Sequence, residues 1–126
     1  MAIDPQTFEY QDTRWMDIYK CLQRHGFDVY SPAQKEGECT KPYVVVKNDG
    51  GYKHLTKSSF RQQYSIIVCV PKREYSKLDS MVMAVKKSMK DLYPMIRDYG
   101  QIQPSAYDDV LKAHQQSIEY ECYKKL

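Results

Sequence analysis

The residues of this chain that could do chemistry are few and scattered. Its cysteines are Cys21, Cys39, Cys69 and Cys122, and no two of them have the C-x-x-C spacing of zinc or redox sites. Nucleophilic catalysis needs a cysteine or serine beside a base. Only Cys39 falls in a predicted loop, and no local motif joins it to any of the three histidines. The other cysteines lie in periodic segments as small core residues. We therefore predict no catalytic residue and no enzymatic activity.

Metal binding has weak support in the sequence. Asp108, Asp109 and His114 offer oxygen and nitrogen donors, but their spacing matches no metal-ligand pattern. The segment Asp49-Gly50-Gly51 is not followed by the Gly-Lys-Ser/Thr of a phosphate-binding loop. These residues are expected to be solvated loop residues, and no metal or other cofactor is predicted.

Basic and aromatic residues interleave between positions 52 and 64, as they do in proteins that bind single-stranded nucleic acid. The stretch consists of Tyr52, Lys53, His54, Lys57, Phe60, Arg61 and Tyr64. The net charge of the whole chain is only +3, however. A nucleic-acid-binding module is therefore a secondary alternative, because such domains are usually far more basic.

The composition is that of one globular domain. The chain has 126 residues, 42% hydrophobic and 28% charged, enough for a single core over residues 1–126. Residues 1–11 show no period and are expected to be irregular or partly left over from cloning. No apolar run approaches the roughly 18 residues of a membrane span. Without a signal sequence before them, the cysteines predict reduced thiols in a cytoplasmic protein.

Tyrosine is the unusual component, with 12 residues against 3 Phe and 1 Trp. A tyrosine ring is apolar and its hydroxyl is polar, so tyrosine is enriched at surfaces that contact other proteins. Some of these tyrosines are expected in the core and at least two at an interface. The composition therefore favours a protein that binds other proteins.

Two helices are predicted from apolar residues that recur at helical spacing. The first spans about residues 13–25 and buries a stripe around Ile18. The second spans about residues 76–93 and begins at a variant capping box formed by Ser76 and Asp79. Both helices have one apolar face, so both are expected to pack on the same core.

Strands are predicted at residues 27–30, 43–47, 60–70 and 117–123, with a short one near Ile102. The sequence Asn48-Asp49-Gly50-Gly51 is the strongest turn signal and predicts a polar hairpin tip over residues 48–59. Residues 105–111 are expected to be loop. Short connections favour antiparallel pairing. The predicted fold is α+β: a mainly antiparallel four- to five-stranded sheet with two helices packed on one face.

Two of the predicted strands are apolar on both faces. Residues 43–46 and 66–70 lack the alternation expected of a sheet with one wet face. If the helices cover one face, either irregular loops or another subunit must cover the second. Both explanations stay open, and the second would make this face a protein contact.

Three stretches of the chain resemble the tail terminator, or tail completion, proteins of long-tailed bacteriophages, both lambda-type and Gram-positive siphophage versions. They are QRHGFDVYSP followed by KPYVVVKND, the polar loop entering SSFRQQYSIIVCVPKREYSKLDSM, and the ending YDDVLKAHQQSIEYECYKK. The order, the length and the general character of these stretches match over most of residues 13–125, and none of the stretches is a strict signature. Head–tail joining and minor capsid proteins have a similar size and α+β character.

The resemblance implies a non-enzymatic virion protein that forms a hexameric ring, caps the tail tube, ends its polymerisation and provides the surface for head attachment. The implied partners are other copies of the chain, which is often monomeric until it meets the tube, the tail tube protein, and a head-completion or connector protein. DNA passes through the ring without specific binding, and no membrane is involved. The implied location is the virion tail, assembled in the cytoplasm of the bacterial host. A head–tail connector, a minor capsid protein or a generic adaptor is the alternative.

Two surfaces are candidates for these contacts. The polar hairpin is a candidate for contact with the tube or the next subunit, through Asn48, Asp49, Tyr52, Lys53, His54 and Lys57. Glu119 and Glu121 alternate on one strand face and are candidates for the wall of the lumen, since an acidic wall does not bind DNA. The alternative is that both are ordinary solvent-facing carboxylates.

Overall fold

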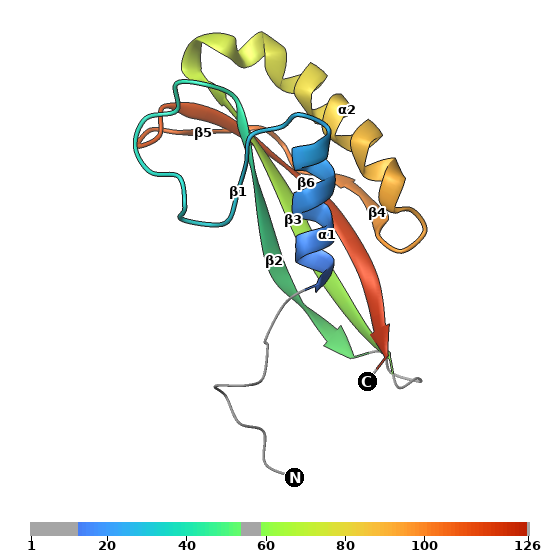
Figure 1. The fold of residues 1–126 in the computed structure, drawn as a ribbon. Helices are drawn as coiled ribbons and strands as arrows, with labels where there is room; N and C mark the ends of the chain where they lie inside the picture. The colour runs from blue at the N-terminus through green and yellow to red at the C-terminus, as the bar shows by residue number, and fades with distance from the viewer. Residues whose placement is uncertain (1–12, 54–58, 126) are drawn as a thin grey trace, which may run out of the picture.

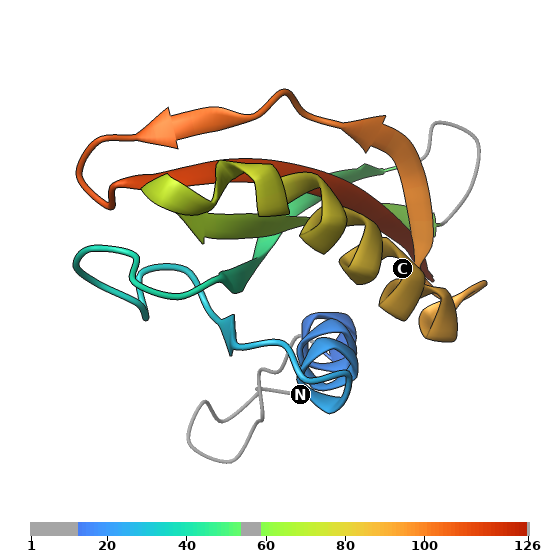
Figure 2. The same cartoon turned by 90° about the horizontal axis from the view of Figure 1, so that it is seen from above.

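The computed structural model describes residues 13–53 and 59–125. Within this part, the chain forms two α-helices and a sheet of six strands, with both helices on the same side of the sheet (Figures 1 and 2). The strand order is β1-β2-β3-β6-β4, and β5 also pairs with β6. Strand β1 runs parallel to β2, whereas the other pairs are antiparallel. The predicted α+β class is confirmed, with a mixed sheet. None of the helices described is long and apolar enough to cross a membrane.

Helix α1 spans Thr13–Arg24 and buries Ile18, Cys21 and Leu22. Helix α2 spans Leu78–Met89, between the 3-10 helices η1 (Lys72–Lys77) and η2 (Lys90–Leu92). These bounds agree with the two predicted helices, although the second has 3-10 turns at both ends.

The predicted capping box at Ser76 and Asp79 is wrong. Lys77 occupies the N-cap of α2, and no side chain caps this helix. The chain enters α2 directly from η1, so the amide of Leu78 already donates to the carbonyl of Tyr75. A continuous helical entry therefore replaces the side-chain cap.

The strands are β1 (Val29–Tyr30), β2 (Tyr43–Lys53), β3 (Ser59–Pro71), β4 (Arg97–Ile102), β5 (Ala106–Asp108) and β6 (Ala113–Lys125). Strand β3 lies at the centre and pairs with β2 on one side and β6 on the other. The expectation of loop for residues 105–111 is wrong in part, because three of them form β5 against β6. The strand is too short to show a period in the sequence.

The predicted turn at residues 48–51 is also wrong, because β2 continues to Lys53 with a bulge between Asn48 and Gly51. Gly50 adopts a φ of 79°, and its amide donates to Asn48 Oδ1 over 2.7 Å. Gln62 Nε2, from β3, donates to Asn48 Oδ1 and to the carbonyl oxygen of Gly50, both at 2.6 Å. A side chain of the neighbouring strand thus satisfies the polar atoms, and the glycine accommodates an extra residue in the strand.

The main core fills the space between the sheet and the two helices. The sheet contributes a continuous apolar face, and each helix contributes one stripe. Its fully buried members include Ile18, Leu22, Val44, Val46, Tyr64, Ile66, Val68, Val70, Val85 and Ile118. Burial of each such side chain is worth about 1.5–3 kcal/mol, so this face supplies most of the hydrophobic stabilisation.

A smaller core lies on the opposite face of the sheet. Cys39, Tyr43, Cys69 and Ala113 are buried there. Cys39 belongs to the loop over residues 31–42, and its amide donates to the carbonyl of Leu111 over 2.8 Å. Of the two explanations for the two-faced strands, loops therefore account for this end of the face.

Candidate functional site

The middle of this outer face is only half covered. Val45 of β2 and Ile67 of β3 are direct cross-strand neighbours, and both are partly exposed beside the smaller core. Further along the strands the same face becomes polar. We call the region from Val45 and Ile67 to Glu121 the outer sheet face.

Two ion pairs lie on the outer sheet face. Lys47 Nζ lies 3.7 Å from Asp49 Oδ1, and the hydroxyl of Ser65 donates to the Asp49 carboxylate. Arg61 on β3 forms an ion pair with Glu121 on β6. Each of these two carboxylates therefore has a basic partner on the face.

The structure places the two candidate lumen residues on this face, as strand alternation predicts. Glu121 is only 8% exposed because it lies under Arg61. Glu119 is half-buried and accepts a hydrogen bond from Gln103 Nε2 over 3.2 Å. Both carboxylates are thus held by neighbouring side chains, and the surface to which they belong has little net charge.

The candidate contact loop is mostly strand. Asn48 and Asp49 are exposed residues of the bulged part of β2, and residues 52 and 53 end that strand. His54 and Lys57 lie outside the described residues. Strands β2 and β3 are therefore longer than predicted.

The basic and aromatic stretch of residues 52–64 does not form one surface in the part described. Tyr64 is completely buried in the main core, on the helix side of β3. Arg61 points to the opposite face, where it pairs with Glu121. Arg61 and Tyr64 therefore lie on opposite faces of the sheet.

Exposed apolar side chains gather at one end of the sheet. Val110 is 84% exposed, in the turn between β5 and β6. Tyr107 of β5 and Tyr75 of η1 are also exposed, and their ring centroids lie 5.1 and 4.6 Å from that of His114. We call Tyr75, Tyr107 and Val110 the projecting patch; β5 and its turn lie at one extremity of the molecule in Figure 1.

A cleft of about 400 Å³ lies between the end of α2 and β4. Figure 1 shows these two elements on the side of the molecule away from β5. Its walls are mostly apolar and consist of Lys86, Met89, Lys90, Tyr93, Ile96, Asp98 and Tyr120. Lys86 Nζ lies 3.1 Å from Asp98 Oδ2 and links the two walls. Tyr93 is 67% exposed, and burial raises the pKa of Tyr120, which stays a neutral phenol. We call this the apolar cleft.

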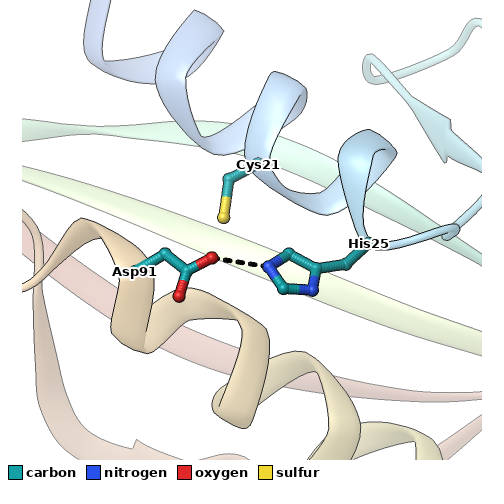
Figure 3. A group of neighbouring side chains, drawn as sticks. All are labelled: Cys21, His25 and Asp91. Carbon is teal, nitrogen blue, oxygen red and sulfur yellow. Dashed lines mark hydrogen bonds and ion pairs between the residues drawn. The ribbon is translucent and has the colours of Figure 1, made fainter.

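Three side chains that can bind metal converge between α1 and η2 (Figure 3). Cys21 lies on α1, His25 follows the last residue of that helix, and Asp91 belongs to η2. One ligand atom from each lies within 4.8 Å of the others. His25 Nε2 lies 2.6 Å from Asp91 Oδ2, while Cys21 Sγ donates to the carbonyl oxygen of Ser88 over 3.4 Å.

The electrostatics of this cluster do not favour a nucleophilic cysteine. Burial raises the pKa of the Cys21 thiol, and the Asp91 carboxylate raises it further, against a smaller opposing effect of Arg24. A thiol that stays protonated is a poor nucleophile. The Cys-His-Asp set therefore has the composition of a catalytic triad without the thiolate that catalysis needs.

Sequence reasoning assigned Cys21 to the core and missed this cluster. The available signal was the spacing of Cys21 and His25, which places two side chains on one face of a helix. Asp91 is 66 residues from His25, so no local pattern could connect them.

The metal donors considered from the sequence are not brought together. Asp108 Oδ1 accepts the amides of Val110 and Leu111 and so closes the turn after β5. His114 lies between two tyrosine rings. Across residues 13–53 and 59–125, the one group of three metal-binding side chains is that of Cys21, His25 and Asp91.

Comparison of the chain with protein-family models and with curated proteins gives no match.

Proposed function

We propose that this chain is a virion assembly protein of a long-tailed bacteriophage, which forms a ring on the tail tube, ends tube growth and provides the surface for head attachment. The observation that carries the proposal is the presence of two different apolar surfaces, the projecting patch and the apolar cleft, at opposite ends of one subunit. The parts of the proposal that concern the tail, the tube and the hexamer come from the resemblance of three sequence stretches to tail terminator proteins.

Two different surfaces on one subunit are what a ring requires. Contacts between unlike patches join subunits head to tail, and they close into a ring when the rotation between neighbours fits. Val110 and Tyr107 project, whereas Met89 and Ile96 line a hollow. Apolar and tyrosine side chains at the centre of an interface supply most of its binding free energy. Surface ion pairs contribute only about 0–1 kcal/mol each, so they are not needed to hold the ring.

The outer sheet face suits the wall of a lumen through which DNA passes. It carries two ion pairs, Lys47–Asp49 and Arg61–Glu121, and the opposite charges cancel within each pair. A wall with little net positive charge does not hold phosphates, so DNA slides past it. In the proposed ring, this face therefore points to the axis, and the helices point outward.

The long strands suit contact with the tube. Strands β2, β3 and β6 extend beyond both helices (Figure 1). The bulged part of β2 carries the exposed Asn48 and Asp49. In the proposed assembly, the extended ends of these strands contact the tail tube protein.

The test is to add the purified protein to tail tubes assembled from the tail tube protein of the same phage. Electron microscopy of tube ends, with mass photometry of the released caps, should show one closed ring of about six subunits per tube. The protein alone should be monomeric. Binding to capsids or head connectors, and none to tubes, would reject the terminator role and support the head-side alternative.

A further inference from the structure

We propose that Cys21, His25 and Asp91 form a binding site for a divalent metal ion of the zinc type, a site that the sequence analysis did not predict. The inference rests on the geometry of the cluster and is independent of the proposed role in the tail. Failure of one therefore leaves the other standing.

The three ligand types are those that zinc selects. Thiolate sulfur, imidazole nitrogen and carboxylate oxygen bind zinc at roughly 2.0–2.3 Å, usually in a tetrahedron, whose ligand atoms then lie roughly 3.3–3.8 Å apart. In this cluster the three candidate atoms all lie within 4.8 Å of one another. Small side-chain rotations bring His25 Nε2 and Asp91 Oδ2, now 2.6 Å apart, to that spacing.

The site has one buried side and one open side. Cys21 is 1% exposed and fixed on α1, whereas the side chains of His25 and Asp91 are 37% and 51% exposed. The exposed pair gives the ion an entry path and leaves the fourth position to water. Figure 3 shows the sulfur and the His25–Asp91 pair directed into the same space between the helical segments.

Metal binding replaces two interactions that the cluster makes without the ion. The ion displaces the proton of the Cys21 thiol, which is released to solvent, and the sulfur gives up its hydrogen bond to the Ser88 carbonyl. The ion also takes the place of the hydrogen bond between His25 and Asp91: Nε2 gives up its proton and becomes the ligand, and the neutral ring carries its one proton on Nδ1. No redox change is involved.

The bound ion would tie α1 to the segment after α2. Cys21 comes from the first helix and Asp91 from η2, so the ligands join two elements that are far apart in the chain. Since the unfolded chain does not hold the three ligands together, binding adds to the stability of the fold.

The test uses the full chain, without an affinity tag and with its thiols kept reduced. Zinc and cobalt are titrated against a chromophoric chelator at neutral pH. We expect binding of one ion per chain, a thiolate-to-cobalt charge-transfer band in the near ultraviolet, and a midpoint of thermal unfolding raised by roughly 5–10 °C at zinc a hundredfold above its Kd.

Variants identify the ligands. Cys21→Ser should remove the charge-transfer band and weaken binding at least about tenfold, as losses of ligating or supporting groups do. Asp91→Asn and His25→Gln change exposed residues, so they test the site without risk to the fold. Cys39→Ser and His114→Gln are the matched controls and should bind as the wild type does.

Two results would overturn the proposal. One is the absence of stoichiometric binding to the folded wild-type protein. The other is cobalt binding with no thiolate band, or with a band that Cys39→Ser removes and Cys21→Ser does not.

Discussion

The two faces of the sheet are stabilised in different ways. The helix face carries the main apolar core, which packs against α1 and α2. The outer sheet face has a small loop-covered core at one end, half-exposed Val45 and Ile67 in the middle, and ion pairs beyond them. The helix face therefore holds the fold together, and the outer sheet face contributes less to stability.

The largest difference in the effect of a substitution on stability is expected between two adjacent residues of β3. Ile66 points to the helix face and is fully buried, whereas Ile67 points to the outer face and is half-buried. Ile66→Ala should lower the free energy of unfolding by about 3–4 kcal/mol, because it leaves a cavity in the main core. Ile67→Ala should lower it by only about 1 kcal/mol. Urea unfolding of both variants checks this, and equal losses would contradict the division between the faces.

The smaller core should be sensitive to alkali. Burial raises the pKa of Cys69 from 9.0 to about 11. Below pH 9 the thiol is protonated in both states, so its stabilising effect is complete. Between about pH 9 and pH 11 the unfolded chain ionises first, and stability falls by up to about 2–3 kcal/mol.

Cys69→Ala should remove this part of the alkaline loss. Urea unfolding at pH 8, 9, 10 and 11 measures it in the wild type and the variant. Parallel pH curves would show that the Cys69 thiol does not carry the effect.

The two ion pairs of the outer sheet face should contribute differently to the stability of the fold. Glu121→Gln removes a buried carboxylate charge from half-buried Arg61 and should cost about 1–2 kcal/mol. Lys47→Ala breaks an exposed pair and should cost less than about 1 kcal/mol. Added salt should reduce the stability difference between wild type and Lys47→Ala more strongly than the difference between wild type and Glu121→Gln. If both variants lose the same stability, the burial of Glu121 has no energetic role.

The projecting patch should matter least to the isolated protein. Val110→Glu changes a residue that is 84% exposed, so the free energy of unfolding should stay within about 0.5 kcal/mol of the wild type. The same variant should fail to form rings on tail tubes. Met83→Glu, at a half-exposed position outside both apolar surfaces, is the matched control and should form rings. Normal rings with Val110→Glu would show that this patch is not a subunit contact.

Much of the fold is predictable from the sequence, because it depends on local periodicity. The apolar stripes around Ile18 and Leu78 predict both helices, and the alternation near Ile118 predicts β6 and the face to which Glu119 belongs. The extent of β2 was not predictable. Its turn signal at Gly50 becomes a bulge only because Gln62 of another strand satisfies the local polar atoms.

The candidate sites were also not predictable from local sequence patterns. Both apolar surfaces combine residues from several elements, such as Tyr75 with Tyr107, or Met89 with Tyr120. The metal-binding cluster needs α1 packed beside η2 before Asp91 reaches His25. Contacts that depend on such tertiary packing leave no pattern in a single sequence.

The most direct test of the central proposal is the length of tail tubes made in cells with and without this protein. Without it, or with Val110→Glu in its place, electron microscopy should show tubes of uncontrolled length. Wild type and Met83→Glu should restore one uniform length and a capped end. Tubes of normal length in the complete absence of the protein would contradict the proposal that it ends tube growth.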